Sequence, residues 1–186
     1  MKPTDARNNA DLLQALEAGA RPKYVYFWGH RPRRQGEIDK SCFSQWFPAP
    51  FQVEGTTYLT AEHYMMAEKA RLFGDSEIQA KIIAAGNPGE AKKLGRKVRG
   101  FDNAAWEEHR FKIVVTGNVE KFRRHPAMGG FLLGTGDRVL VEASPVDAVW
   151  GIGLAADDSA ATTPAGWKGL NLLGYALMEV RARLKG

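Results

Sequence analysis

The chain has 186 residues, of which 44% are hydrophobic, and its formal net charge is +5 at pH 7. This length and composition suit an ordinary protein whose single domain encloses one substantial core. Residues 1–21 hold only short apolar pairs, so we expect no signal peptide, no membrane span and a cytoplasmic location. A single cysteine, Cys42, excludes an internal disulfide. Four scattered histidines show no metal-ligand spacing, and we expect neither a metal nor a cofactor.

The basic charge balance fits a phosphorylated or nucleic-acid partner. Lysines and arginines cluster within residues 31–34, 92–99 and 121–124. No nucleic-acid-reading motif accompanies these clusters, so each is interpreted first as a solvated face.

The first half of the chain predicts a short helix, a strand and a hairpin. The helix covers residues 11–18 and ends at Gly19, and the aromatic and β-branched segment 23–28 predicts a strand that stops at Gly29. A polar loop follows over residues 31–40. Alternating residues around Glu54-Gly55 then predict a hairpin over residues 51–58.

The second half is mostly helical. Four helices are predicted, with the N-cap positions Thr60, Ser76, Asn87 and Asp102. The second of them runs to residue 85, and the fourth is long, supplies much of the core and is interrupted at residues 125–126. A second strand is predicted over residues 139–143 and a final helix over 172–184, with Asn171 at its N-cap. Residues 154–168 are predicted to be the least structured part, a loop long enough to act as a lid.

One helical segment, residues 60–70, carries a carboxylate and an amine seven residues apart. At ~100° per residue, Glu62 and Lys69 differ by only about 20° around the helix axis, and two turns separate their backbones by ~10 Å. Two long side chains could close that distance around a sugar-sized group. The alternative interpretation of this spacing is a solvated charged face.

Six segments occur in an order and spacing typical of one family. They are FWGH at residues 27–30, FSQWFPAPF at 43–51, TAEHYMMAEKA at 60–70, Trp106, DAVWG at 147–151 and GLNLLG at 169–174. On these motifs the chain, from about residue 24 to 184, resembles the NADAR superfamily of YbiA-like N-glycosidases. The resemblance implies a mainly α fold, a compact multihelical single domain with a few short β-strands. We expect that domain over residues 23–186, preceded by an N-terminal extension over residues 1–22.

The resemblance also implies an enzyme that hydrolyses an N-glycosidic bond between a ribose and a nitrogen heterocycle. One associated substrate class is ADP-ribosylated guanine in DNA or a nucleotide, and another is the phosphorylated ribosylamino-pyrimidine intermediates of riboflavin synthesis. A third hypothesis is a module that binds ADP-ribose or a nucleotide without turnover. The presence of both Glu62 and Lys69 argues against this module, and no obligate protein partner is implied.

Residue roles transfer where the motifs match. Glu62 takes the place of the acidic catalytic residue, Lys69 that of a lysine linked to covalent chemistry at the anomeric carbon, and Asp147 that of a third residue linked to activity. The predicted substrate-binding residues are Phe27, Trp28, Ser44, Trp106, Trp150, Gly151 and Asn171. The chain departs from many members at Gln45, where they have Asn, and at residues 65–68. These departures bear on substrate choice more than on the chemistry.

The proposed chemistry needs a neutral amine. Cleavage passes through an oxocarbenium-like state, which Glu62 could stabilise as an anion and a base while Lys69 forms a Schiff base. Burial would lower the pKa of Lys69 and a nearby ionised Glu62 would raise it, so the sequence leaves the direction open. Plainer roles are also open: Trp106 and Trp150 as core, Asp147 as a turn cap, Asn171 as both cap and pocket residue, His63 as a structural histidine and Met65 and Met66 as core.

Overall fold

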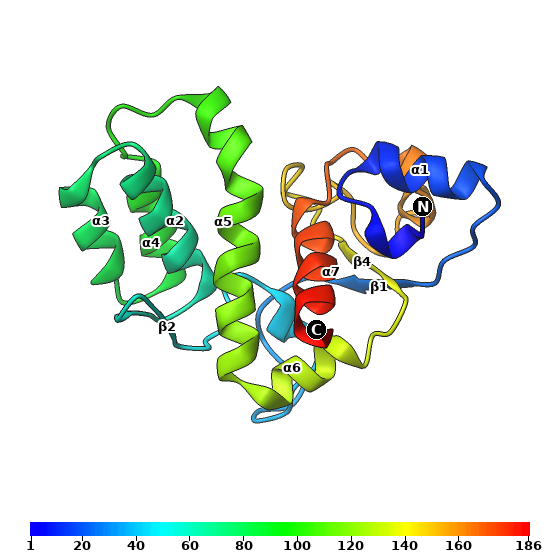
Figure 1. Ribbon diagram of the computed structural model, residues 1–186, viewed down its shortest axis with the longest axis horizontal. Helices are drawn as coiled ribbons and strands as arrows, with labels where there is room; N and C mark the ends of the chain where they lie inside the picture. The colour runs from blue at the N-terminus through cyan, green and yellow to red at the C-terminus, as the bar shows by residue number, and fades with distance from the viewer. The chain divides into compact units, whose positions relative to one another are not determined.

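Helices dominate the structure, a computed structural model that describes residues 1–186 (Figure 1). The helices are α1 (Asn9–Glu17), α2 (Ala61–Leu72), α3 (Ser76–Ile83), α4 (Pro88–Gly95), α5 (Asn103–Arg124), α6 (Pro126–Leu133) and α7 (Leu172–Lys185). The strands are β1 (Tyr24–Phe27), β2 (Phe51–Val53), β3 (Thr56–Tyr58) and β4 (Val139–Glu142). Short 3-10 helices are η1 (Pro3–Asp5), η2 (Lys40–Phe43), η3 (Ser159–Thr162) and η4 (Pro164–Gly166). The predicted mainly α fold class with a few short strands is confirmed.

The chain divides into two units. One, here called the terminal unit, consists of Met1–Ser44 and Ala127–Gly186, and the other, the central unit, is Gln45–Pro126. None of the helices has the length together with the apolar content that a bilayer crossing requires.

The terminal unit is organised around two parallel strands. β1 pairs with β4 in the register Tyr24↔Val139 to Phe27↔Glu142, so the carboxyl ends of both strands lie at the same edge. Residues 139–141 are entirely buried, which fits their continuous apolar sequence. α7 packs against β4 and supplies buried Leu173 and Leu177.

Residues 1–22 take part in the terminal unit. Leu12 of α1 is fully buried, and Asn9 accepts a hydrogen bond from the hydroxyl of Tyr175 in α7 at 2.9 Å. A domain boundary after residue 22 stays a prediction, but these residues contribute side chains to the core of this unit.

The central unit begins with the predicted hairpin, in which β2 and β3 are antiparallel. Glu54 and Gly55 have φ values of 48° and 80°, as a two-residue hairpin turn with left-handed central residues requires. Thr60 caps α2, because its hydroxyl accepts the His63 N–H at 3.4 Å. α2 then packs against α3, α4 and α5.

Two predictions about helix ends are wrong. Ser76 is the first residue of α3 and not its cap, because the carboxylate of Asp75 accepts the Ile78 N–H at 3.2 Å. Asp75 is held there by Arg99, whose guanidinium donates to it at 2.6 and 3.0 Å. α3 also ends at Ile83, two residues earlier than predicted.

The segment over residues 154–168 has more structure than predicted. It contains η3 and η4, and its Leu154, Ala161 and Trp167 are buried. The carbonyl oxygen of Ala161 accepts from the Trp167 indole at 2.9 Å and from the Tyr26 hydroxyl at 3.1 Å. A lid role for this segment stays a prediction.

Candidate active site

Glu62 lies in the first turn of α2 and is 3% exposed. A solvated charged face is therefore the wrong interpretation for this residue. Its main-chain N–H donates to the carbonyl oxygen of Gln45 at 3.0 Å. The helix dipole favours an anion at this position.

An amide pair lies next to that turn. Asn118 of α5 donates from Nδ2 to Oε1 of Gln45 at 2.7 Å and to the carbonyl oxygen of Val114 at 2.9 Å. Nε2 of Gln45 and Oδ1 of Asn118 are buried without a hydrogen-bond partner. Buried polar groups that lack partners are uncommon, so each calls for an explanation, and a role in binding or catalysis is one of these.

Asn118 was not predicted from the sequence, and the interpretation of the basic cluster 121–124 as a solvated face is wrong for Lys121, which is fully buried in the same helix. A signal for both was present. Asn118, Lys121 and Phe122 follow Val114 at i+4, i+7 and i+8, which places two polar residues on the apolar stripe of an amphipathic helix.

Lys69 lies near the end of α2, about 10 Å along the helix axis from Glu62. Its Nζ donates to the carbonyl oxygen of Gly95 at 2.9 Å and lies 4.2 Å from the ring centroid of Phe101. Burial lowers the pKa of Lys69 below its usual value. Of the two opposing effects that the sequence left open, burial therefore prevails, and the neutral amine becomes easier to reach.

Trp106 lies beside Lys69. It begins the buried face of α5, is 8% exposed, and its ring centroid lies 5.8 Å from Nζ of Lys69. The indole thus contributes to the apolar surroundings of the amine. Glu62, Lys69 and Trp106 are all in the central unit.

The remaining predicted site residues are in the terminal unit, and Asp147 forms a turn there. Its Oδ1 accepts the main-chain N–H of Val149 at 2.9 Å and of Trp150 at 2.8 Å. Asp147 is thus a turn cap, as one interpretation of the sequence held, and it fixes the start of the Trp150 segment. Its catalytic role stays a prediction.

Gly151 and Asn171 are brought together. The N–H of Asn171 donates to the carbonyl oxygen of Gly151 at 3.1 Å. A Cβ on Gly151 would lie 2.9 Å from the carbonyl oxygens of both Asp147 and Glu142, so only glycine fits without a shift.

Asn171 occupies the predicted N-cap position of α7, but its side chain makes no cap hydrogen bond. The predicted side-chain cap is wrong, because the amide bridges to β4 instead. Oδ1 accepts the Glu142 N–H at 2.9 Å and Nδ2 donates to the Leu140 carbonyl at 3.0 Å. The residue is fully buried and has a left-handed φ of 53°, which asparagine tolerates better than most residues.

Phe27 and Trp28 lie at the carboxyl end of β1, and Ser44 follows η2. Phe27 is buried with its ring 5.4 Å from that of Phe43, whereas Trp28 is 60% exposed. An exposed tryptophan at the carboxyl edge of parallel strands is well placed to stack on a ligand.

Two structural expectations for other residues agree with the structure. His63 is fully buried, with Nδ1 2.8 Å from the Thr60 hydroxyl and Nε2 3.0 Å from the Ala85 carbonyl oxygen. Met65 and Met66 are core residues. The side chains of the described chain form no group of three or more His, Cys, Asp or Glu residues that could hold a metal ion.

Comparisons with known proteins agree with this arrangement of motifs. Residues 26–185 match the model of the NADAR domain family. The chain is 43% identical over 164 residues to N-glycosidase R617 of Acanthamoeba polyphaga mimivirus, covering 86% of this chain and 95% of that relative. It is 35% identical over 144 residues to N-glycosidase Npun_R5314 of Nostoc punctiforme, with 77% and 85% covered.

A solved structure extends the likeness to the fold. The NMR structure of the Escherichia coli protein YbiA superposes with a TM-score of 0.70 at 28% identity, covering 89% of this chain and 87% of that one. The fold and the ordered motifs define a NADAR-type protein, and the chain belongs to the NADAR domain family.

Proposed function

We propose that the protein is an N-glycosidase that hydrolyses the bond between a ribose and a nitrogen heterocycle. The observation that carries this proposal is Lys69, an amine whose pKa is lowered by burial beside the rings of Phe101 and Trp106. The names of the mimivirus and Nostoc relatives, both N-glycosidases, support the same bond type. A cytoplasmic location is part of the proposal.

The proposed mechanism uses Lys69 as the nucleophile. The lone pair of its neutral amine attacks C1′, and the heterocycle leaves with the electron pair of the C1′–N bond and takes up a proton. The bond between C1′ and the ring oxygen then opens to a Schiff base, and the amine proton passes to that oxygen. Water adds to the imine carbon, which regenerates the amine and releases the sugar.

Glu62 acts in this proposal as the base and electrostatic stabiliser. Its buried position at the start of α2 suits an anion that faces developing positive charge on the sugar. Asp147 is the third proposed catalytic residue. The proposed substrate-binding residues are Phe27, Trp28, Ser44, Trp106, Trp150, Gly151 and Asn171.

The substrate we favour is guanine that carries ADP-ribose, in DNA or in a nucleotide. The net charge of +5 suits both a pyrophosphate and a nucleic-acid strand. A phosphorylated ribosylamino-pyrimidine of riboflavin synthesis is the alternative, and it requires only a monophosphate pocket. Binding of ADP-ribose without turnover is a further alternative.

The test is mass-resolved turnover of a guanine-ADP-ribosylated DNA oligonucleotide with borohydride trapping in parallel. Wild type is compared with Glu62→Gln, Lys69→Met and Lys69→Arg, and exposed Lys112→Met serves as the matched control. We expect ADP-ribose release and a trapped adduct on Lys69 in wild type and control only. Arginine keeps the charge of Lys69 without its nucleophilicity, so substantial turnover by Lys69→Arg would overturn the Schiff-base role.

Substrate choice is decided by the same assay with the pyrimidine intermediate. If the enzyme cleaves only the pyrimidine intermediate, that compound and not ADP-ribosylated guanine is the substrate. If the protein binds ADP-ribose but forms no product from either substrate, the remaining hypothesis is a non-catalytic binding module.

A further inference from the structure

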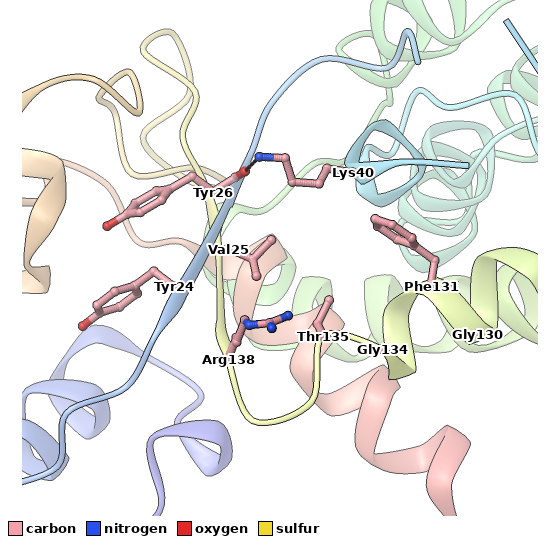
Figure 2. A pocket seen from close by; sticks show the side chains of 9 residues that line it. All are labelled: Tyr24, Val25, Tyr26, Lys40, Gly130, Phe131, Gly134, Thr135 and Arg138. Carbon is pink, nitrogen blue, oxygen red and sulfur yellow. Dashed lines mark hydrogen bonds between the residues drawn. The ribbon is translucent and has the colours of Figure 1, made fainter. Parts of the chain in front are cut away.

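Two adjoining hollows open on the surface of the terminal unit. The first, about 640 Å³, is shown in Figure 2 and is lined by Tyr24, Val25, Tyr26, Lys40, Gly130, Phe131, Gly134, Thr135 and Arg138. None of the residues predicted for the glycosidase site lines it. Its volume falls within the range of ligand sites, so the chemistry of its walls decides what it could hold.

The walls of the first hollow are apolar and basic. Lys40 and Arg138 lie on either side of Val25, and Phe131 faces them from α6 (Figure 2). Lys40 is fixed in place because its Nζ donates to the carbonyl oxygen of Tyr26 at 2.7 Å. No carboxylate lines this hollow. The first hollow is therefore complementary to a ligand that combines a negative charge with an apolar group.

The second hollow, about 540 Å³, continues the basic surface. It shares Gly134, Thr135 and Arg138 with the first, so Arg138 borders both. It adds Lys2, Arg21 and Lys23, and its one carboxylate is Asp137. The five cations of the two hollows, here called the basic surface, are Lys2, Arg21, Lys23, Lys40 and Arg138.

The turn over residues 135–138, which borders both hollows, is hydrogen-bonded to Arg181 of α7. Its Nη1 donates to the Thr135 hydroxyl at 2.7 Å and to the Arg138 carbonyl oxygen at 2.9 Å, and Thr135 donates in turn to the Leu132 carbonyl at 2.6 Å. Arg181 is only 3% exposed. The backbone that carries Arg138 is thus ordered before any ligand arrives, which reduces the entropy lost on binding.

We infer that the basic surface is a docking site for the phosphodiester backbone of a nucleic-acid strand. A single phosphate is bound by donors that converge on one point, whereas these cations are spread along two adjoining hollows, as a chain of phosphates requires. Val25 and Phe131 offer apolar contact to sugars and bases between the charges. The choice of nucleic acid as the polymer rests on the proposed function, while the binding itself requires no turnover.

The test is binding of a fluorescein-labelled single-stranded DNA 12-mer without modification, followed by anisotropy at several salt concentrations. The variant is Lys23→Gln with Arg138→Gln, and the control is Lys112→Gln with Arg124→Gln, which removes two exposed cations of the central unit. We expect the first variant to bind ~10-fold more weakly and its slope of log K against log salt to shrink by about 0.7 for each lost phosphate contact. The control should keep the affinity and slope of wild type.

The docking inference and the proposed function can fail separately. Binding of the unmodified DNA needs no catalytic group, so it is measured independently of turnover. Equal affinity of the Lys23/Arg138 variant and wild type would overturn the inference, as would an equal loss in the control. Displacement of the DNA by poly-glutamate at the same charge concentration would instead assign the surface to an acidic protein. Absence of glycosidase turnover with this binding pattern intact would overturn only the proposed function.

Discussion

Asn118 donates to the side chain of Gln45 at 2.7 Å, and the main chain of Gln45 accepts the N–H of Glu62 at 3.0 Å. One residue thus connects α5 to the first turn of α2. The amide pair is therefore suited to fix the position of the proposed catalytic carboxylate.

Replacement of Asn118 by Leu removes the donor to Gln45 and leaves Oε1 of Gln45 buried and unsatisfied. We expect the free energy of unfolding to fall by about 1–3 kcal/mol and turnover to fall because the Glu62 turn is less fixed. Urea unfolding and turnover measure the two effects. Gln52→Leu is the control, since that exposed amide bonds only to Thr57 at 3.1 Å. A variant with wild-type stability and turnover would contradict the positioning role.

The lowered pKa of Lys69 predicts the pH dependence of adduct formation. Burial disfavours the ammonium, so the neutral amine appears at lower pH than for an exposed lysine. We expect the rate of borohydride trapping with substrate present to rise with pH and to reach half its maximum below pH 10.5, the ordinary pKa of lysine. A midpoint at or above 10.5 would show that the amine is hydrated.

Gly117 allows α5 to approach α2 closely. A Cβ at this position would lie 2.3 Å from Cδ1 of buried Tyr64. Gly117→Ala is therefore expected to lower the free energy of unfolding by about 1–3 kcal/mol through overpacking. Gly130→Ala is the matched control within α6, where a Cβ meets nothing within 4 Å, and it should be neutral or slightly stabilising. Equal thermal midpoints for the two variants would contradict the close approach.

His63 predicts a loss of stability on acidification. Burial lowers its pKa below 6.5, so above pH 6.5 it is neutral in both states and has no effect. As the pH falls below 6.5, the unfolded chain binds the proton first, and stability falls by at most ~1.4 kcal/mol per pH unit until the folded pKa is reached. Denaturant unfolding from pH 7.5 to 5 should show this slope in wild type and exposed His109→Gln, but a smaller one in His63→Gln. Identical slopes in all three would exclude His63 as the source.

Features decided within a few residues were predictable from the sequence. The turn at Glu54-Gly55 and the caps Thr60, Asn87 and Asp102 depend on neighbouring residues. β1 was indicated by its own aromatic and β-branched residues, although its pairing with β4 was not. Asp75 was not predicted as the cap of α3. Its carboxylate is positioned by a hydrogen bond from Arg99, which is 24 residues away in the sequence.

In the candidate site, too, contacts between residues distant in the sequence were not predicted. The motif spacing predicted Glu62 and Lys69 on one helix, but it did not reveal that Glu62 is buried or that burial controls the pKa of Lys69. The bond from Asn118 to Gln45 spans 73 residues, and the Asn171 bridge to β4 spans about 30. Such contacts are fixed by tertiary packing, which a local pattern does not encode.

The parallel pairing of β1 with β4 has a consequence for how the molecule is made. A ribosome releases Tyr24–Phe27 long before Val139–Glu142, and all of the central unit emerges between them. The central unit, as one continuous stretch, can therefore fold while synthesis continues, whereas β1 has no partner strand until β4 has been translated. Because such long-range pairing is slow to form, the unpaired edge of β1 needs protection from aggregation in the nascent chain.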